Sequence, residues 1–154
     1  MSPPDLRFRR VAPADLPRLM EIERAAFLHP WSEPQLRAEL GNAWSVMLAA
    51  EEPTAAGGLR MAGYVIVWAV HDELHVLNVA TAPEARRRGI GRALMEEAHR
   101  LGRERACRVA TLEVRRSNAA AIALYQALGY RQVGMRPRYY AEENEDALLM
   151  NLDL

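Results

Sequence analysis

Apolar residues recur with two different periods in the first part of the chain. Apolar and basic residues alternate over residues 6–9, which predicts a short strand. Over residues 16–27 the apolar positions follow helical spacing, and Asp15 stands where a helix-capping residue is expected. A second helix is predicted to begin after Ser32, because a serine followed three positions later by Gln35 forms a capping box.

The middle of the chain predicts three strands. Residues 44–50 and 60–70 are rich in apolar residues, and residues 53–58 between them have the Pro, Thr and Gly composition of a loop. We expect these two strands to form an antiparallel hairpin. A third strand is predicted over residues 74–81, and Pro83 follows its end.

The final part of the chain predicts alternating helices and strands. Ile90, Leu94 and Ala98 fall on one helical stripe, and Asn118 can cap a later helix that Gly129 closes. The predicted elements are a helix over residues 89–103, a strand over 109–114, a helix over 118–128 and strands over 130–138 and 147–152. The order of all elements predicts an α/β (α+β) fold with a mixed sheet flanked by helices.

Length and composition limit the class of protein. A chain of 154 residues fits one domain, which we assign to residues 1–154. No apolar run approaches the roughly 20 residues that cross a bilayer, and residues 1–5 lack the pattern of a secretion signal. Cys107 is the only cysteine, and the histidines do not have the spacing of metal ligands. We therefore expect a cytoplasmic protein with no disulfide, no metal and no membrane partner.

Charge is distributed unevenly along the chain, although the net charge is zero. Residues 86–116 contain ten arginines and four glutamates, so the remaining residues are correspondingly acidic. Nucleic-acid surfaces usually combine basic with aromatic residues, and this segment has no aromatic residue. We expect no direct nucleic-acid partner and favour an anionic cofactor, with a solvated arginine-rich helix as the alternative.

A glycine loop lies at the start of this basic segment. Residues 86–91 have the sequence Arg-Arg-Arg-Gly-Ile-Gly and connect a predicted strand to a predicted helix. Glycines and a helix start can direct backbone N–H groups at a phosphate, and the arginines add positive charge. A dinucleotide loop requires glycine where Leu94 stands, and a nucleoside triphosphatase loop requires a lysine, which this sequence lacks. An ordinary glycine turn remains the alternative.

The same loop carries a family resemblance. Arg86, Gly89 and Gly91 fit the pattern Arg/Gln-x-x-Gly-x-Gly, which resembles the pyrophosphate loop of the GCN5-related N-acetyltransferase (GNAT) family. Further segments extend the resemblance over nearly the whole chain. They are Phe27 and residues 30–33 in the first half, and residues 78–80, 112–115, 117–122, 124–125, 128–130 and 138–140 in the second. Ala82 departs from the family, where an aspartate is frequent before the proline, and this affects turn geometry only.

The resemblance implies a fold and a cosubstrate. The GNAT fold has a mixed, mostly antiparallel central sheet with one splayed strand pair, flanked by about four helices. Its cosubstrate is acetyl-CoA, and the implied contacts include a backbone N–H near Val79 that polarises the thioester carbonyl. Asn118 would reach the pantetheine or the phosphates. The implied cofactor-binding residues are Val79, Ala80, Thr81, Arg86, Arg87, Arg88, Gly89, Ile90, Gly91, Arg92 and Asn118.

Two residues are candidates for proton transfer. Glu113 matches the proton acceptor of the family, and its alternative is a surface glutamate paired with Arg115 or Arg116. Tyr125 matches the acid that protonates the departing thiolate, and its alternative is a core tyrosine. An acetyl-cysteine intermediate at Cys107 is disfavoured, because no histidine has a motif-like spacing from it. We therefore expect direct attack in a ternary complex.

The acceptor is the least determined part of the sequence-based prediction. Within the family, the resemblance is to bacterial enzymes that acetylate the N-terminal alanine of a small-subunit ribosomal protein. A terminal amine of pKa ~8 is roughly a tenth neutral at pH 7, whereas a lysine amine is neutral about once in 2,500. A terminal amine is therefore easier to deprotonate than a lysine amine, and a weaker general base is sufficient. The alternatives are a small free amine, such as a polyamine or antibiotic, and a non-catalytic acyl-CoA-binding sensor.

Residues outside the motifs are candidates for acceptor binding. Pro30 and Trp31 could form one wall of a small pocket, and Tyr139 and Tyr140 could cover it from the other side. The acidic residues 142–146 would favour the N-terminus of a basic protein, such as a ribosomal protein, as the partner. The alternative is that residues 142–146 form a solvated turn.

Overall fold

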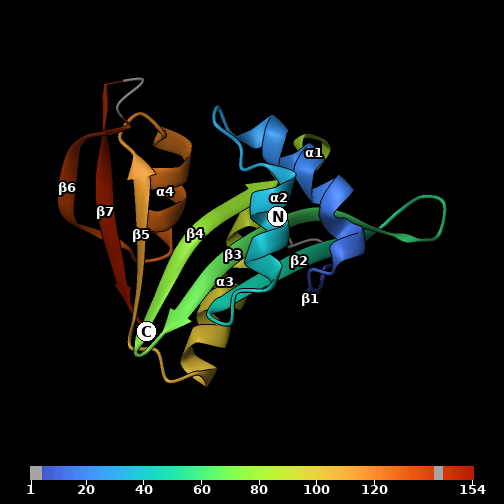
Figure 1. Ribbon diagram of the computed structural model, residues 1–154, viewed down its shortest axis with the longest axis horizontal. Coiled ribbons are helices and arrows are strands. Elements are labelled where there is room, and N and C mark those ends of the chain that lie inside the picture. The colour runs from blue at the N-terminus through green and yellow to red at the C-terminus, as the bar shows by residue number, and fades with distance from the viewer. Residues whose placement is uncertain (1–4, 141–143) are drawn as a thin grey trace.

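The computed structural model of the protein describes residues 5–140 and 144–154. Figure 1 shows the arrangement of its elements. The strands are β1 (Arg7–Arg10), β2 (Ser45–Pro53), β3 (Leu59–Val70), β4 (Glu73–Thr81), β5 (Val109–Arg115), β6 (Arg131–Tyr140) and β7 (Glu145–Asp153). The helices are α1 (Leu16–Ala26), α2 (Glu33–Leu40), α3 (Ile90–Glu104) and α4 (Ala119–Ala127), with short 3-10 turns at η1 (Pro13–Asp15) and η2 (Pro83–Ala85).

The seven described strands form one sheet in the order β1-β2-β3-β4-β5-β7-β6. Neighbouring strands are antiparallel except for β4 and β5, which are parallel. This confirms the predicted mixed, mostly antiparallel sheet and the hairpin formed by β2 and β3. The one parallel pair joins the two halves of the chain, since β4 ends the first half of the sheet and β5 begins the second.

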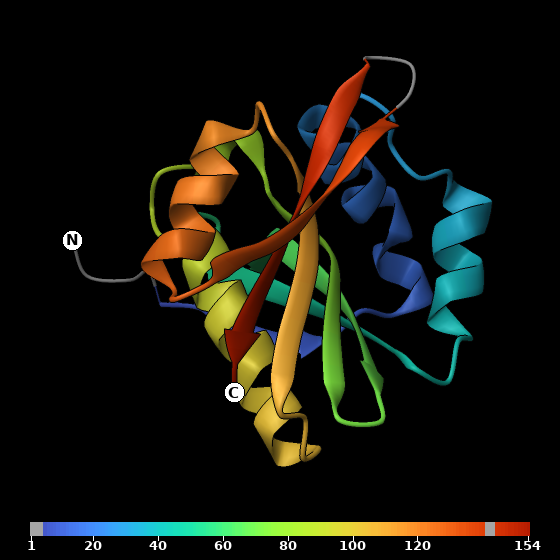
Figure 2. The same ribbon diagram turned by 90° about the vertical axis from the view of Figure 1, so that its left-hand side faces the viewer.

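Helices cover both faces of the sheet. Figure 2 shows α1 and α2 on one side of it and α3 and α4 on the other. The helical stripe of α1 buries Leu16, Leu19 and Ile22 completely, and that of α3 buries Ile90 and Leu94. Both α1 and α3 pack against β3 and β4, so these two strands lie at the centre of the core.

The parallel strands β4 and β5 separate along their length. Their ladder joins residues 73–76 to residues 109–112, and both strands continue beyond it without pairing to each other. On the β3 side, Ile66 faces Asn78 and Val67 faces Val76, so Leu77 is an extra residue in β4. A bulge of this kind bends the strand and increases its twist. The bulge and the diverging strands form the predicted splayed pair, visible between β4 and β5 in Figure 1.

The ends of several elements differ from the predictions. Strand β2 extends to Pro53 and β7 begins at Glu145, because ladder hydrogen bonds continue through polar residues that have no apolar signal. The expected capping box at Ser32 and cap at Asn118 are both present. The cap expected at Asp15 is wrong, because its carboxylate accepts from the backbone N–H of Ala12 and pairs with Arg9 instead.

Candidate active site

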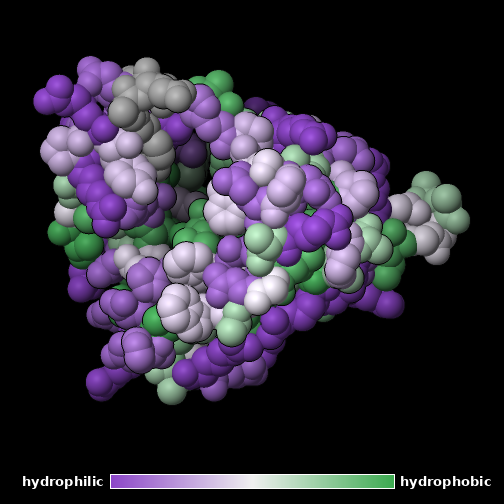
Figure 3. All heavy atoms as spheres, viewed as in Figure 1, coloured by the Kyte–Doolittle hydropathy of each residue, from purple (hydrophilic) through white to green (hydrophobic). Residues whose placement is uncertain are grey.

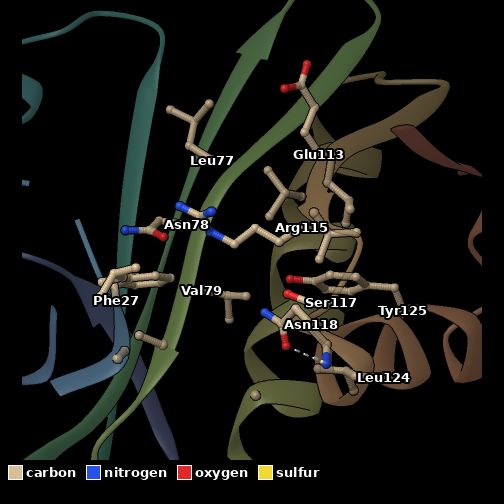
Figure 4. A pocket seen from close by; sticks show the side chains of 18 of the residues that line it. Phe27, Leu77, Asn78, Val79, Glu113, Arg115, Ser117, Asn118, Leu124 and Tyr125 are labelled. Carbon is tan, nitrogen blue, oxygen red and sulfur yellow. Dashed lines mark hydrogen bonds between the residues drawn. The ribbon is translucent and has the colours of Figure 1, made fainter. Parts of the chain in front are cut away.

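A cavity of about 650 Å³ lies where β4 and β5 separate. Figure 3 shows the molecule hollowed in this region, and Figure 4 shows the side chains around the cavity. We call residues 26–29 and 76–81 the β4 wall. We call residues 112–115, 117, 118, 121, 124, 125 and 145 the β5 wall, and Gly91 completes the lining.

The β4 wall contains three of the predicted cofactor-binding residues. Val79, Ala80 and Thr81 line the cavity from the part of β4 that lies beyond its ladder with β5. On the side where β5 has moved away, the backbone of this segment faces the cavity. An extended ligand with amide groups could therefore add to the sheet here.

The glycine loop meets the cavity at the first turn of α3. Gly91 lines the cavity, and a Cβ added to it would lie 3.6 Å from Oγ1 of Thr81. Gly89 caps α3 in a left-handed conformation with φ of 78°, which glycine adopts without strain. The start of a 15-residue helix thus lies beside the cavity, an arrangement that favours anions.

The arginines of the loop surround this helix start but do not line the cavity. Arg88 pairs with Glu52, Arg92 pairs with Glu96, and Arg86 donates to the backbone oxygen of Ala25. Ile90 is buried in the core, and Arg87 has a left-handed backbone with φ of 65°. Cofactor binding by these residues stays a prediction.

Glu113 lies on the β5 wall and forms an ion pair that was not predicted from the sequence. Its Oε1 lies 3.2 Å from a guanidinium nitrogen of Arg136 on β6, and the two side chains are 29% and 55% exposed. The alternative partners named above bind elsewhere, since Arg115 pairs with Glu145 and Arg116 with Asp146. Glu113 is therefore open to the cavity and partly open to solvent.

Tyr125 lies on the same wall, in the last turn of α4. The residue is buried, and its hydroxyl points into the cavity toward Val79 in Figure 4. Asn118, at the other end of α4, also lines the cavity, and its Oδ1 accepts from the backbone N–H of Ala121 at 3.3 Å. Glu113 and Tyr125 thus reach one cavity from two elements. This placement is compatible with the predicted base and acid, and their roles stay predictions.

A buried polar network supports the β4 wall. Glu23 on α1 is 1% exposed, and its carboxyl accepts from Tyr64, from the side-chain amide of Asn78 at 2.7 Å and from the backbone N–H of Trp31 at 3.0 Å. Burial and the neighbouring Glu23 raise the pKa of Tyr64. Sequence analysis did not assign Glu23 or Asn78 to the site, although a glutamate inside an apolar helical stripe was the available signal.

The acceptor side of the cavity differs from the expected arrangement. Phe27, Leu28 and His29 line the cavity, whereas the neighbouring Pro30 and Trp31 do not. Pro30 is exposed, and Trp31 packs against the core. Acceptor contacts by Pro30 and Trp31 stay predictions. The sequence analysis did not assign residues 27–29 to acceptor binding.

The other predicted acceptor residues come from β6 and the acidic segment. Tyr139 is half exposed, and the guanidinium of Arg136 lies 5.3 Å from its ring centre. The side chain of Tyr140 and residues 141–143 lie outside the described part of the structure. Glu145 lines the cavity, and hydrogen bonds from Ser117 lower the pKa of its carboxyl. Glu145 is thus a negative charge at the cavity near neutral pH.

Three other features considered in the sequence analysis were a reactive cysteine, a metal site and a membrane-spanning segment. Cys107 is buried outside the lining, and burial raises the pKa of its thiol, which opposes nucleophilic attack by the thiolate. Across residues 5–140 and 144–154, no cluster of three or more His, Cys, Asp or Glu residues could hold a metal ion. No helix in these ranges is long and apolar enough to cross a membrane.

Comparisons with known proteins agree with this geometry. The ribosomal protein bS18-alanine N-acetyltransferase of Salmonella typhimurium is 38% identical over 143 residues, covering 91% of this chain and 92% of that protein. The crystal structure of the ribosomal-protein-S18-alanine N-acetyltransferase from Escherichia coli superimposes with a TM-score of 0.84 at 33% identity, covering 96% of this chain and 93% of that one.

A more distant structure shares the same fold. Arabidopsis thaliana NAA60 in complex with acetyl-CoA gives a TM-score of 0.83 at 22% identity, over 97% of this chain and 98% of that chain. In addition, residues 16–130 match the family described as the Acetyltransferase (GNAT) family. The splayed strands, the glycine loop and the sequence matches lead to one conclusion: this chain belongs to the GNAT acetyltransferase family.

Proposed function

We propose that this chain transfers the acetyl group of acetyl-CoA to the α-amino group at a protein N-terminus, specifically the N-terminal alanine of ribosomal protein S18. The family supports the acetyl transfer, and the relatives at 38% and 33% identity support the acceptor. With this acceptor, the enzyme acts in the cytoplasm, as one domain over residues 1–154 and without a metal.

One observation carries the proposal. Glu113 and Tyr125 come from different elements and line a single cavity, next to a strand whose backbone faces that cavity. Acetyl transfer to an amine needs a proton acceptor for the ammonium and a proton donor for the thiolate on either side of one thioester. Glu113 and Tyr125 would supply these two groups.

Acetyl-CoA would be held by three features of the chain. The backbone of residues 77–81 would pair with the pantetheine arm, and an N–H near Val79 would polarise the thioester carbonyl. The first turn of α3, including Gly91, would receive the pyrophosphate, with the loop arginines supplying positive charge. Asn118 lines the cavity close to α4 and would contact the pantetheine.

The chemical step is a direct transfer. Glu113 accepts a proton from the α-ammonium, either directly or through a water, and the neutral amine attacks the thioester carbonyl carbon. The new N–C bond forms as the C–S bond breaks, and the CoA thiolate takes a proton from the Tyr125 phenol. The nitrogen, now bonded to the acetyl group, releases its second proton to solvent and becomes the neutral amide. Both side chains then exchange protons with solvent, which restores them for the next turnover.

A panel of peptides tests the acceptor. A peptide that begins with alanine and continues with arginines should react faster than one with a bulky first residue or one that continues with acidic residues. Glu145 at the cavity favours the basic peptide, and added salt should shrink that preference, because screening acts on exposed charges. The measurement is release of the CoA thiol, with the acetylated terminus located by mass spectrometry.

The Glu113→Gln variant is the control for this panel. It should keep its affinity for acetyl-CoA and lose about 100-fold in rate, because general-base catalysis contributes 10²–10⁴-fold. Equal rates for all peptides, together with efficient acetylation of a polyamine, would favour the small-amine function. Binding of acetyl-CoA with no turnover on any amine would favour the sensor.

A further inference from the structure

A buried hydrogen-bonded pair lies behind the β5 wall and has no part in the mechanism above. His99 on α3 and Tyr130 just before β6 are each 4% exposed, and Nε2 of His99 lies 2.7 Å from the hydroxyl oxygen of Tyr130. Neither residue lines the cavity. Buried polar groups cost stability unless they form hydrogen bonds, and here Nε2 of His99 and the hydroxyl of Tyr130 bond to each other.

The way α4 ends brings Tyr130 to Tyr125. Gly129 has φ of 101°, and the backbone N–H groups of Gly129 and Tyr130 donate to the oxygens of Gln126 and Tyr125, both at 3.0 Å. These two bonds form a Schellman motif, which places the residue after the glycine against the residue five positions earlier. The rings of Tyr125 and Tyr130 accordingly lie 5.7 Å apart, tilted by 55°.

The three side chains form a continuous chain of contacts. Tyr125 contacts Tyr130, and Tyr130 bonds to His99, whose ring centre is 5.5 Å from that of Tyr130. His99 belongs to α3, which packs against β3 and β4 and begins at the glycine loop. The proposed acid is therefore connected to the helix whose first turn would hold the pyrophosphate.

We infer that His99 and Tyr130 are positioning residues that hold the phenol of Tyr125 at the thiol side of the cavity. The inference rests on the proposed function, in which Tyr125 protonates the CoA thiolate. Tyr125 has its ring fixed on one side by Tyr130, and Tyr130 is in turn held by one hydrogen bond to a neighbouring helix. Loss of that bond lets both rings tilt, and small displacements of a catalytic group cost large factors in rate.

The test compares kcat and KM of variants with acetyl-CoA and a peptide that begins Ala-Arg. His99→Leu removes the bond and should lower kcat about 10-fold with little change in the KM for acetyl-CoA. His99→Gln should restore most of the rate, because a glutamine amide nitrogen can replace Nε2 of histidine. Tyr130→Phe removes the same bond from the other side and should lower kcat similarly, which keeps the test usable if His99→Leu does not fold.

Two controls separate positioning from a general loss of stability. Met95→Ala truncates another fully buried side chain of α3 and should keep kcat despite its lower stability. In the Tyr125→Phe background, where no phenol is left to position, His99→Leu should cause no further loss of kcat. A kcat for His99→Leu equal to that of the native chain, or an equal loss in Met95→Ala, would overturn the inference.

Failure of the proposed function gives a different result. If Tyr125 is not the acid, the Tyr125→Phe variant keeps the native kcat. If the chain does not acetylate peptides, the native chain itself shows no turnover. A slow Tyr125→Phe variant, combined with an additive loss from His99→Leu in that background, overturns the positioning role alone.

Discussion

The two walls of the cavity are supported in different ways. The β4 wall is tied together by the carboxyl of Glu23, which is 1% exposed and joins α1, β3, β4 and the loop before α2. The charged side chains of the β5 wall form ion pairs instead, Glu113 with Arg136 and Arg115 with Glu145. The buried support of this wall lies behind it, at His99 and Tyr130.

This difference corresponds to the two tasks of the site. The β4 wall would hold the thioester, whose position should vary little between turnovers, and a buried network suits this requirement. On the β5 wall, Tyr125 and Asn118 would also contact acetyl-CoA, whereas Glu113 and Glu145 would meet the acceptor. Surface ion pairs contribute only about 0–1 kcal/mol each, so Glu113, whose partner Arg136 is 55% exposed, can change partners at little cost.

The largest expected effect is on the β4 wall. Glu23→Ala leaves the hydroxyl of Tyr64, the amide of Asn78 and the N–H of Trp31 without their acceptor, so the free energy of unfolding should fall by roughly 3–5 kcal/mol. Chemical denaturation measures this change. The control is Glu21→Ala on the exposed side of the same helix, which should change stability by less than about 0.5 kcal/mol. A loss below about 1 kcal/mol in Glu23→Ala would remove the distinction between the walls.

The sequence predicted much of this architecture for physical reasons. Periodicity indicated the helices over residues 16–27 and 89–103, apolar runs indicated the central strands, and the caps at Ser32 and Asn118 indicated the other two helices. The capping box at Ser32 and the cap at Asn118 are local, since each involves residues within three positions. The glycine loop is likewise a short segment, and the splayed strand pair was implied by the family resemblance that this loop and the other matching segments carry.

The parts that the sequence did not reveal depend on contacts between distant residues. Glu23 meets Asn78 only when α1 packs on β4, and Glu113 meets Arg136 only when β6 pairs with β7 beside β5. Likewise, the bend after α1 decides that residues 27–29 line the cavity and that the neighbouring Trp31 does not. The wrong cap at Asp15 has a local cause instead, because the side chain of Arg9 and the N–H of Ala12, within six positions, donate to its carboxylate.

An intermediate effect is expected behind the β5 wall, where His99 makes stability depend on pH. Burial, with a smaller contribution from Arg103, lowers the pKa of His99 from 6.5 to about 4, and Glu96 opposes this shift. Between these values the unfolded chain binds a proton that the folded chain does not. The free energy of unfolding should therefore be highest above pH 6.5 and fall by up to about 3 kcal/mol as the pH drops toward 4.

Two variants isolate this contribution. His99→Gln has no group that titrates in this range, so its denaturation curves should depend less on pH between 6.5 and 4 than those of the native chain. His99→Leu also lacks the titrating ring and should show the same weaker dependence. Identical pH dependence in His99→Gln and the native chain would mean that His99 is accessible to protons in the fold, which contradicts its burial.

The smallest effect is expected at the ion pair of the β5 wall. Arg136→Gln frees Glu113 from a partner that is 55% exposed and makes the cavity more negative. Unfolding free energy should change by less than about 1 kcal/mol, and the rate with a basic peptide at low salt should rise about 2- to 3-fold. At 1 M salt the Debye length is about 3 Å, so the rates of Arg136→Gln and the native chain should converge.

The control for this prediction is Arg131→Gln, which removes the same charge from the same strand beside Asp153 and should leave the rate unchanged. An increase that persists at high salt would instead indicate that Arg136 blocks the cavity by its volume, and the β5 wall would then differ from the β4 wall in shape as well as in charge.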